Sequence, residues 1–233
     1  MEANESLLDV GEYRVNCARL GRGDPLLLLH GSDHHESWRT WEPMLSLSDS
    51  FSLIIPDLVG YGRSTRPAET PDYRTQAHVV RDLLEKIGVG SAFAMGAGWG
   101  AQVALELALQ WPQTVRGLVL VAASYDKGQL PRLSKLGKPA LIVYAVDDMV
   151  TQLKAGYLLR DAIGTSRLEV LEPVAKDPSL DFTISHRLQA FRPGPLSQLV
   201  RRFLADPSSM VAEPPEMEKE LRGMALKRDE PLP

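Results

Sequence analysis

Short apolar runs alternate with longer helical segments through most of this sequence, and that alternation limits the folds open to the chain. The runs are nearly continuous Leu, Ile and Val, as in strands of a parallel sheet that is covered on both faces. They are Tyr13–Leu20, Leu26–His30, Phe51–Pro56, Ser91–Met95, Gly117–Ala122, Ala140–Ala145 and Arg167–Leu171, with a weaker run at Leu7–Val10. We therefore expect a sheet of eight strands.

Four of the intervening segments predict helices. Thr75–Ile87 has apolar residues at helical spacing, and Gly88 follows it as a stop signal. The other three are Ala101–Trp111, Leu153–Ile163 and Leu196–Leu204. Strands that alternate with helices through short loops indicate an α/β fold with a doubly wound, mostly parallel sheet. The first two strands are close enough in sequence to form an antiparallel edge.

Composition excludes several classes of protein. The 233 residues are 44% hydrophobic and 24% charged, which is ordinary for a globular domain that needs no disulfide or metal to fold. The single cysteine, Cys17, cannot form an intrachain bridge, which favours a reducing, cytoplasmic compartment. The net charge of −4 argues against nucleic-acid and anionic-membrane partners. No signal-peptide pattern and no apolar stretch of about 20 residues is present.

The character of the sequence changes near its end. We expect residues 1–205 to form one domain and residues 206–233 to form a mobile tail, because the last part mixes prolines and charges with few large apolar residues. At most one short helix is expected there, near Glu216–Lys227. A partner-binding segment is the alternative interpretation of this tail.

Three segments carry a resemblance to a known family. They are LLLLHGSDHHESW (Leu26–Trp38), IIPDLVGYGRS (Ile54–Ser64) and AFAMGAGWGAQVALELALQWP (Ala92–Pro112). In this order and spacing they resemble the α/β-hydrolase superfamily, over roughly residues 7–205. The resemblance implies the α/β-hydrolase fold. Only the short segment Ser124–Lys138 follows the sixth strand where many relatives insert a large cap, so we expect a shallow, open site.

The nucleophile of that family is missing from this sequence. The family's third segment reads G-x-S-x-G, in which the serine sits on a sharp strand-to-helix turn. Gly96 and Gly100 match the two flanking glycines, but Gly98 stands at the serine position. No Ser, Cys or Asp lies between Phe93 and Glu106, so no shift of register restores a nucleophile. Covalent catalysis at position 98 is therefore not expected.

The resemblance implies that the rest of a catalytic triad is retained. Asp148 follows the run ALIVYAV at the position of the family's acid, with Asp147 as the neighbouring alternative. His186 follows at the position of the family's histidine, so the family's chain order of glycine turn, acid and histidine is kept. The loop from Leu171 to His186 is longer than is usual in the family, which leaves a surface position for His186 as the alternative.

Backbone N–H groups near the turn have the positions of an oxyanion hole. The resemblance implies that they come from Trp99 and from Ser32 or Asp33. The run Asp33–Glu36 contains metal-ligand residue types, but adjacent residues rarely converge on one ion, so we expect a solvated loop and no metal. His30 and Gly31 are expected to shape the turn before that loop.

A dinucleotide-binding fingerprint is a competing interpretation of the glycine turn. Gly96, Gly98 and Ala101 satisfy G-x-G-x-x-G/A between a strand and a helix. That fingerprint calls for an acidic residue at the end of the next strand, about 20 positions on, to bind the ribose. Asp126 lies beyond the end of the predicted strand. We therefore expect no dinucleotide and no other cofactor.

These observations favour a degenerate (pseudo)hydrolase that binds a small ligand or a protein partner. Loss of the same serine to glycine is seen in the N-myc downstream-regulated family, which resembles this chain in fold and turn. Two alternatives stay open. One is an enzyme that uses a His186–Asp148 dyad as a general base without a covalent serine step, as in cofactor-free dioxygenases. The other is an esterase-type hydrolase inactivated at position 98.

Overall fold

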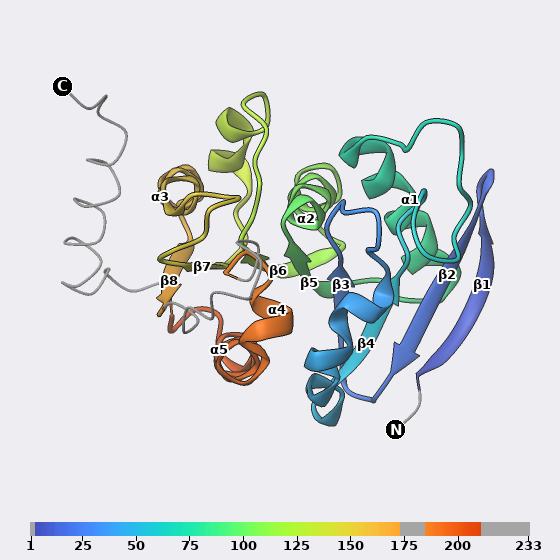
Figure 1. Cartoon of the computed structure of the whole chain (residues 1–233), viewed down its shortest axis with the longest axis horizontal. Coiled ribbons are helices and arrows are strands. Elements are labelled where there is room, and N and C mark those ends of the chain that lie inside the picture. Colours follow the sequence, from blue (N-terminus) through green and yellow to red (C-terminus); the bar gives the residue numbers. More distant parts are fainter. Residues whose placement is uncertain (1–2, 173–184, 211–233) are drawn as a thin grey trace.

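One eight-stranded sheet forms the centre of the protein in a computed structural model that describes residues 3–172 and 185–210 (Figure 1). The strand order is β1-β2-β4-β3-β5-β6-β7-β8. The strands are β1 (Asn4–Val10), β2 (Tyr13–Leu20), β3 (Asp24–Leu29), β4 (Phe51–Pro56), β5 (Ala92–Ala97), β6 (Val115–Val121), β7 (Ala140–Ala145) and β8 (Ser166–Leu171). The helix expected near Glu216–Lys227, and most of the expected tail, lie outside the described residues.

The pairing confirms a doubly wound, mostly parallel sheet. β1 pairs with β2 and β2 with β4 in antiparallel orientation, which makes the predicted antiparallel edge. Every other neighbouring pair is parallel. Because β3, β5, β6 and β7 run in one direction, their carboxyl ends meet at the same edge of the sheet. Ligand sites of open α/β sheets lie at that edge.

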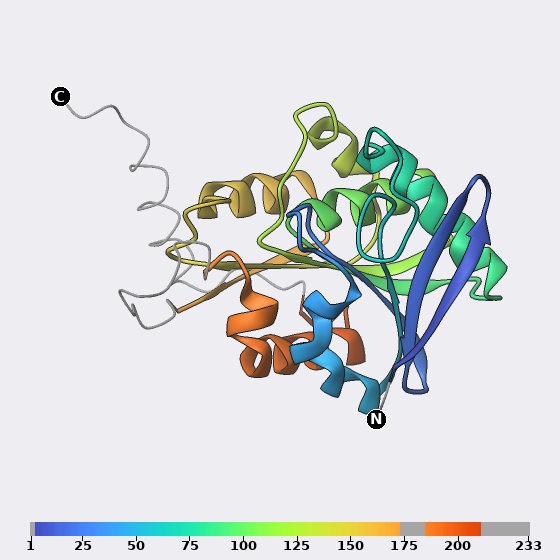
Figure 2. The ribbon, with the colours of Figure 1, turned by 45° about the vertical axis from the view of Figure 1, so that its right-hand side comes forward.

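Helices cover both faces of the sheet, as Figure 2 shows. One face carries α1 (Tyr73–Lys86), α2 (Trp99–Gln110) and α3 (Leu153–Ala162), and the other carries the 3-10 segment η1 (Trp38–Asp49) with α4 (Leu188–Phe191) and α5 (Pro193–Ala205). Val80, Val103 and Tyr157 belong to the first apolar layer. Trp41 and Phe203 belong to the second. Within the described residues, no helix is long and apolar enough to cross a membrane.

Three of the four predicted helices begin earlier than the sequence predicts, whereas α3 begins at Leu153 as predicted. α5 starts at Pro193. Proline fits the first turn of a helix because the N–H groups there have no helical acceptor, and proline has no N–H to leave unpaired. α2 starts at Trp99 rather than at the predicted Ala101, because the turn between β5 and α2 is tight. The predicted helix patterns therefore locate the buried faces but not the ends.

A short segment between β6 and β7 packs beside α2 and stands in place of a large insertion. It contains the 3-10 helix η2 (Leu130–Lys135), whose Leu133 joins the apolar layer of α2 and α3. The Arg132 guanidinium donates to both carboxylate oxygens of Glu106 in α2, at 2.9 and 3.0 Å. Gln129 adds an amide hydrogen bond to Glu106 at 3.3 Å. This network holds the segment against the helices.

Candidate functional site

The turn between β5 and α2, residues 96–100, is hereafter the elbow turn. Gly98 at its centre has φ +53° and ψ −116°, a positive φ that residues with a Cβ rarely adopt. Its N–H donates to the Val121 carbonyl at 2.9 Å, and its own carbonyl accepts from Ser124 N–H at 3.1 Å. Both bonds tie the elbow turn to the end of β6. The turn thus lies at the carboxyl edge of the parallel strands.

Packing explains the two flanking glycines of the elbow turn. A Cβ on Gly96 would lie 2.5 Å from the backbone nitrogen of Ala101, and a Cβ on Gly100 would lie 2.3 Å from the His30 carbonyl oxygen. Neither contact is sterically possible. Among the described residues, a Cβ on Gly98 would meet only the His186 ring within 4 Å. Position 98 is therefore the one of the three glycine positions with room for a side chain.

The imidazole of His186 faces this position. Its Nδ1 lies 3.1 Å from Oδ2 of Asp148, and its Nε2 lies 3.3 Å from the place that a Cβ on Gly98 would occupy. The His186 side chain is 18% exposed. One ring nitrogen thus contacts a carboxylate while the other points to the elbow turn, and His186 does not occupy the alternative surface position.

Asp148 is held rigidly behind the histidine. Its side chain is fully buried, and Oδ1 accepts from the N–H groups of Val150 and Thr151 at 2.8 and 2.9 Å. The Thr151 hydroxyl donates to Oδ2 at 2.8 Å. Asp148, rather than the neighbouring Asp147, lies within hydrogen-bond distance of His186. The carboxylate is oriented by three donors before it meets the imidazole.

A cavity of about 240 Å³ opens over the elbow turn. The predicted oxyanion residues Ser32, Asp33 and Trp99 line it together with Gly98 and His186. The structure therefore brings all the sequence-predicted site residues to one place, with Asp148 behind the His186 ring. The remaining lining residues are Gly31, Glu36, Ala97, Ser124, Val150, Thr151, Arg187 and Gln189.

Glu36 lies in this cavity wall, although the sequence suggested that it was part of a solvated loop. Asp33, His34 and His35 are exposed, but Glu36 is only 6% exposed because its N–H bonds to the Asp33 carbonyl at 2.9 Å and turns the chain inward. The Thr40 hydroxyl donates to its carboxylate. Over residues 3–172 and 185–210, no group of three His, Cys, Asp or Glu side chains is placed to hold a metal ion.

Burial has the largest effect on the pKa of Glu36. Desolvation raises the pKa of its carboxyl, and the nearby charge of Asp33 raises it further. The Thr40 hydrogen bond and the charges of Arg187 and His186 oppose this effect without cancelling it. In the sequence, the burial of Glu36 is indicated only by its neighbours. Ser37, directly after it, caps η1, and Thr40, four residues later, carries the hydroxyl that contacts it.

Two further polar atoms at the cavity lack partners in the described part of the chain. Gln189 is 3% exposed, and its carboxamide oxygen has no hydrogen bond there. The Nε of Arg187 is likewise buried and without a partner. Both residues line the cavity. An unpaired acceptor and an unpaired donor thus belong to residues of the cavity wall.

His30 shapes the strand end beside the cavity, as the sequence indicated. Its ring lies 2.8 Å from the Gly31 carbonyl through Nδ1 and accepts from Leu58 N–H at 3.0 Å through Nε2. Full burial lowers the pKa of His30 to about 4, so the ring is neutral. A neutral ring that donates at one nitrogen and accepts at the other has a structural role.

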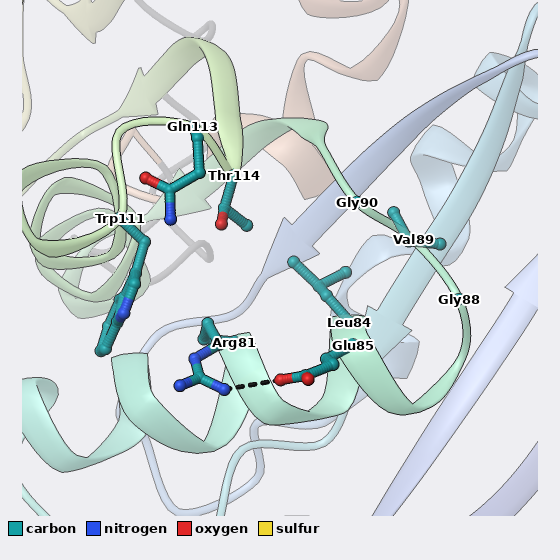
Figure 3. Close-up of a pocket in the computed structure, with 9 residues that line it drawn as sticks. All are labelled: Arg81, Leu84, Glu85, Gly88, Val89, Gly90, Trp111, Gln113 and Thr114. Atoms are coloured by element: carbon teal, nitrogen blue, oxygen red, sulfur yellow. Dashed lines mark hydrogen bonds and ion pairs between the residues drawn. The ribbon is translucent and has the colours of Figure 1, made fainter.

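A larger hollow, of about 550 Å³, lies at the other end of α1 and α2 (Figure 3). Residues of α1 and of the segments directly before β5 and β6 line this hollow. It therefore lies at the amino edge of the parallel strands. Arg81 forms an ion pair at 2.6 Å with Glu85, one turn further along α1, and its guanidinium lies 5.5 Å from the Trp111 ring. The Arg81 Nε, however, is buried and has no hydrogen-bond partner in the described part of the chain. Unlike the smaller cavity, this hollow lies away from the carboxyl edge, where ligand sites of open α/β sheets are found. The smaller cavity over the elbow turn is therefore the candidate functional site.

Sequence comparisons agree with this geometry. Residues 24–131 match the family model for the alpha/beta hydrolase fold. An uncharacterized protein of Mycobacterium tuberculosis is 32% identical over 163 residues, 67% of this chain and 47% of that protein. The soluble epoxide hydrolase of a Corynebacterium species is 33% identical over 129 residues, 55% of this chain and 42% of the enzyme. The chain thus spans about half the length of the curated relatives it matches.

A solved structure has the same architecture over most of both chains. It is the predicted CIB-like hydrolase from Thermoplasma acidophilum, with a TM-score of 0.76 and 23% identity, covering 88% of this chain and 98% of that one. At that identity the likeness concerns the fold alone. The strand order, the elbow turn at the carboxyl edge and the family-model match agree, and the chain has the α/β-hydrolase fold.

Proposed function

We propose that this chain binds a small ligand over the elbow turn and uses the His186–Asp148 dyad as a general base on a water molecule, with no covalent serine step. The observation that carries the proposal is the pair of contacts made by His186: Nδ1 at 3.1 Å from Asp148, and Nε2 facing the open place above Gly98. A histidine held between a carboxylate and an open reaction site has the geometry of a general base.

The dyad geometry defines the proton path. When Nδ1 donates to Asp148, the Nε2 lone pair points toward the elbow turn. A water molecule in the room left by the missing side chain gives its proton to Nε2 and attacks the ligand. The N–H groups of Trp99 and of Ser32 or Asp33 would stabilise the charge that develops on the ligand oxygen. Water as the second reactant agrees with the hydrolase names of the relatives.

Hydrolysis of p-nitrophenyl acetate tests this proposal. We expect slow turnover by the wild-type chain and a drop of about 10²-fold in His186→Ala, the size of a general-base effect. His78→Gln, in exposed surface of α1, is the matched control and should keep the wild-type rate. A fluorophosphonate probe should leave the wild-type chain unlabelled. Equal rates in the wild type and His186→Ala, or labelling of a serine, would contradict the proposal.

A second candidate is a non-catalytic binding protein, and the two unpartnered polar atoms favour it. The Gln189 oxygen and the Arg187 Nε are ready to pair with a small ligand or a peptide group, whether or not His186 moves a proton. Val150, at the cavity and 47% exposed, adds apolar surface. This candidate predicts no His186-dependent turnover. Recovered esterase activity in Gly98→Ser would instead indicate an esterase inactivated at this position.

A further inference from the structure

We infer that Glu36 is the acid partner of the His186–Asp148 base, giving a proton to the oxygen that leaves the attacked carbon. This assignment rests on the proposed function and names a second catalytic group for it. It also defines the ligand class as small, neutral compounds whose departing oxygen is basic enough to need a proton, such as alkyl esters.

The Glu36 carboxyl lies beside the elbow turn. Its Cδ and Oε1 are 3.8 Å from the place that a Cβ on Gly31 would occupy, and that place is also 3.8 Å from the Ala97 carbonyl oxygen. Ala97 directly precedes Gly98. Glu36 and His186 line the same cavity of about 240 Å³, so a ligand that fills the cavity borders both.

The surroundings of Glu36 shift its carboxyl toward the protonated form. The groups that face it are the Thr40 hydroxyl from η1, Asp33 from its own loop, and Arg187 and His186 from the segment before α4. Over the described residues, neither Arg187 nor His186 forms an ion pair with it. Burial is the largest effect and raises the pKa of Glu36, so the proton is retained to a higher pH than in an exposed glutamate.

The two groups complete a balanced hydrolytic step. His186 Nε2 takes a proton from water as the water oxygen bonds to the ligand carbon. The bond from that carbon to the departing oxygen breaks, and this oxygen takes the proton of Glu36. The imidazolium and the carboxylate that remain return to their starting states by proton exchange with solvent. Two titratable groups kept in opposite protonation states are the usual arrangement for paired acid and base catalysis.

Glu36→Gln tests the assignment with two esters that differ in leaving group. The amide has nearly the shape of the acid and keeps a partner for Thr40, but it has no acidic proton. Departing p-nitrophenolate needs no proton, so the loss of rate on p-nitrophenyl acetate should be at least about 10-fold smaller than the loss on an alkyl ester. Ethoxide does need one, so ethyl acetate should be hydrolysed about 10²-fold more slowly, at the lower end of acid–base effects. Glu42→Gln, on the exposed surface of η1, is the matched control and should leave both rates unchanged.

Each outcome decides a different claim. Equal fold changes on the two esters in Glu36→Gln, with His186→Ala still inactive, would overturn the role of Glu36 and leave the dyad in place. Hydrolysis that does not depend on His186 would overturn the proposed function itself. An infrared titration of the wild-type chain needs no variant: a protonated carboxyl band that persists above the ordinary glutamate range supports the assignment, and its absence overturns it.

Discussion

The Nδ1 atom of His186 lies 3.1 Å from Oδ2 of Asp148, and the Thr151 hydroxyl contacts both, at 3.2 and 2.8 Å. Thr151 also contacts the Ala122 carbonyl at 3.1 Å, at the end of β6. The pair is therefore fixed to the sheet by a third side chain. An arrangement of this rigidity keeps the imidazole aimed at the elbow turn without any nucleophile there.

Asp148→Asn should impair the dyad without unfolding the chain. An amide in this position favours the wrong imidazole tautomer, and in a serine protease the same change lowers turnover by about 10⁴-fold. We expect a fall of about 10²- to 10⁴-fold in His186-dependent hydrolysis, measured on p-nitrophenyl acetate. Asp147→Asn is the matched control and should keep the activity. Equal losses in the two variants would contradict the assignment of Asp148.

Gly98→Ser should destabilise the chain while supplying a hydroxyl. Position 98 has φ +53°, and the new Cβ would lie 3.3 Å from His186 Nε2, so the ring must shift slightly. We expect the free energy of unfolding to fall by about 1–3 kcal/mol in urea titrations. Gly98→Ala should lose the same amount. Only the serine variant should react with a fluorophosphonate; labelling of both, or unchanged stability in both, would contradict this.

Sequence patterns predicted the sheet well because its central strands are buried on both faces. Such strands appear as continuous apolar runs, and β4 and β7 begin and end where the runs do. The start of α2 was less well predicted. The elbow turn sets the start of α2 by a positive φ at Gly98, and an apolar pattern contains no signal for backbone conformation.

The same limit applies to the site. Family motifs located Gly98, Asp148 and His186, because each follows a strand or precedes a helix with a characteristic pattern. Glu36 was not distinguished from its exposed neighbours, since its burial depends on one backbone turn and on contacts with Thr40 and the distant Arg187 segment. Contacts between residues far apart in sequence leave no local pattern.

Arg132→Met should loosen the short segment between β6 and β7. Burial alone would raise the pKa of Glu106, but hydrogen bonds from Arg132, Gln110 and Gln129 outweigh it and the pKa is lowered. The ion pair therefore stabilises the fold above the ordinary carboxyl pKa and is lost as the pH falls through the lowered value. At pH 7 we expect a loss of about 2 kcal/mol in the free energy of unfolding.

A double variant tests the reason for that loss. Glu106→Leu with Arg132→Met removes the uncompensated buried carboxylate, and should recover most of the stability. Urea unfolding of both variants at pH 7 provides the measurement. A double variant less stable than Arg132→Met alone would show that the buried charge is not the cause.

His30 should make the fold sensitive to mild acid. Its pKa is lowered to about 4 in the folded chain, against roughly 6.5 when unfolded, so the unfolded chain binds the extra proton between these values. The free energy of unfolding should therefore decrease as the pH falls below about 6.5, by about 2 kcal/mol at pH 5. Urea titrations at pH 7 and 5 measure this change. His30→Gln should reduce the difference, whereas His78→Gln should not; equal slopes in the two variants would contradict it.

Of the three glycines in the elbow turn, two are fixed by their neighbours and one is not. Backbone atoms close the space at Gly96 and Gly100, whereas only the edge of the His186 ring borders Gly98 among the described residues. A substitution at residue 98 can thus change the group presented at the turn without changing the fold. A library varied at residue 98 alone would therefore sample the reactive groups that this framework accepts.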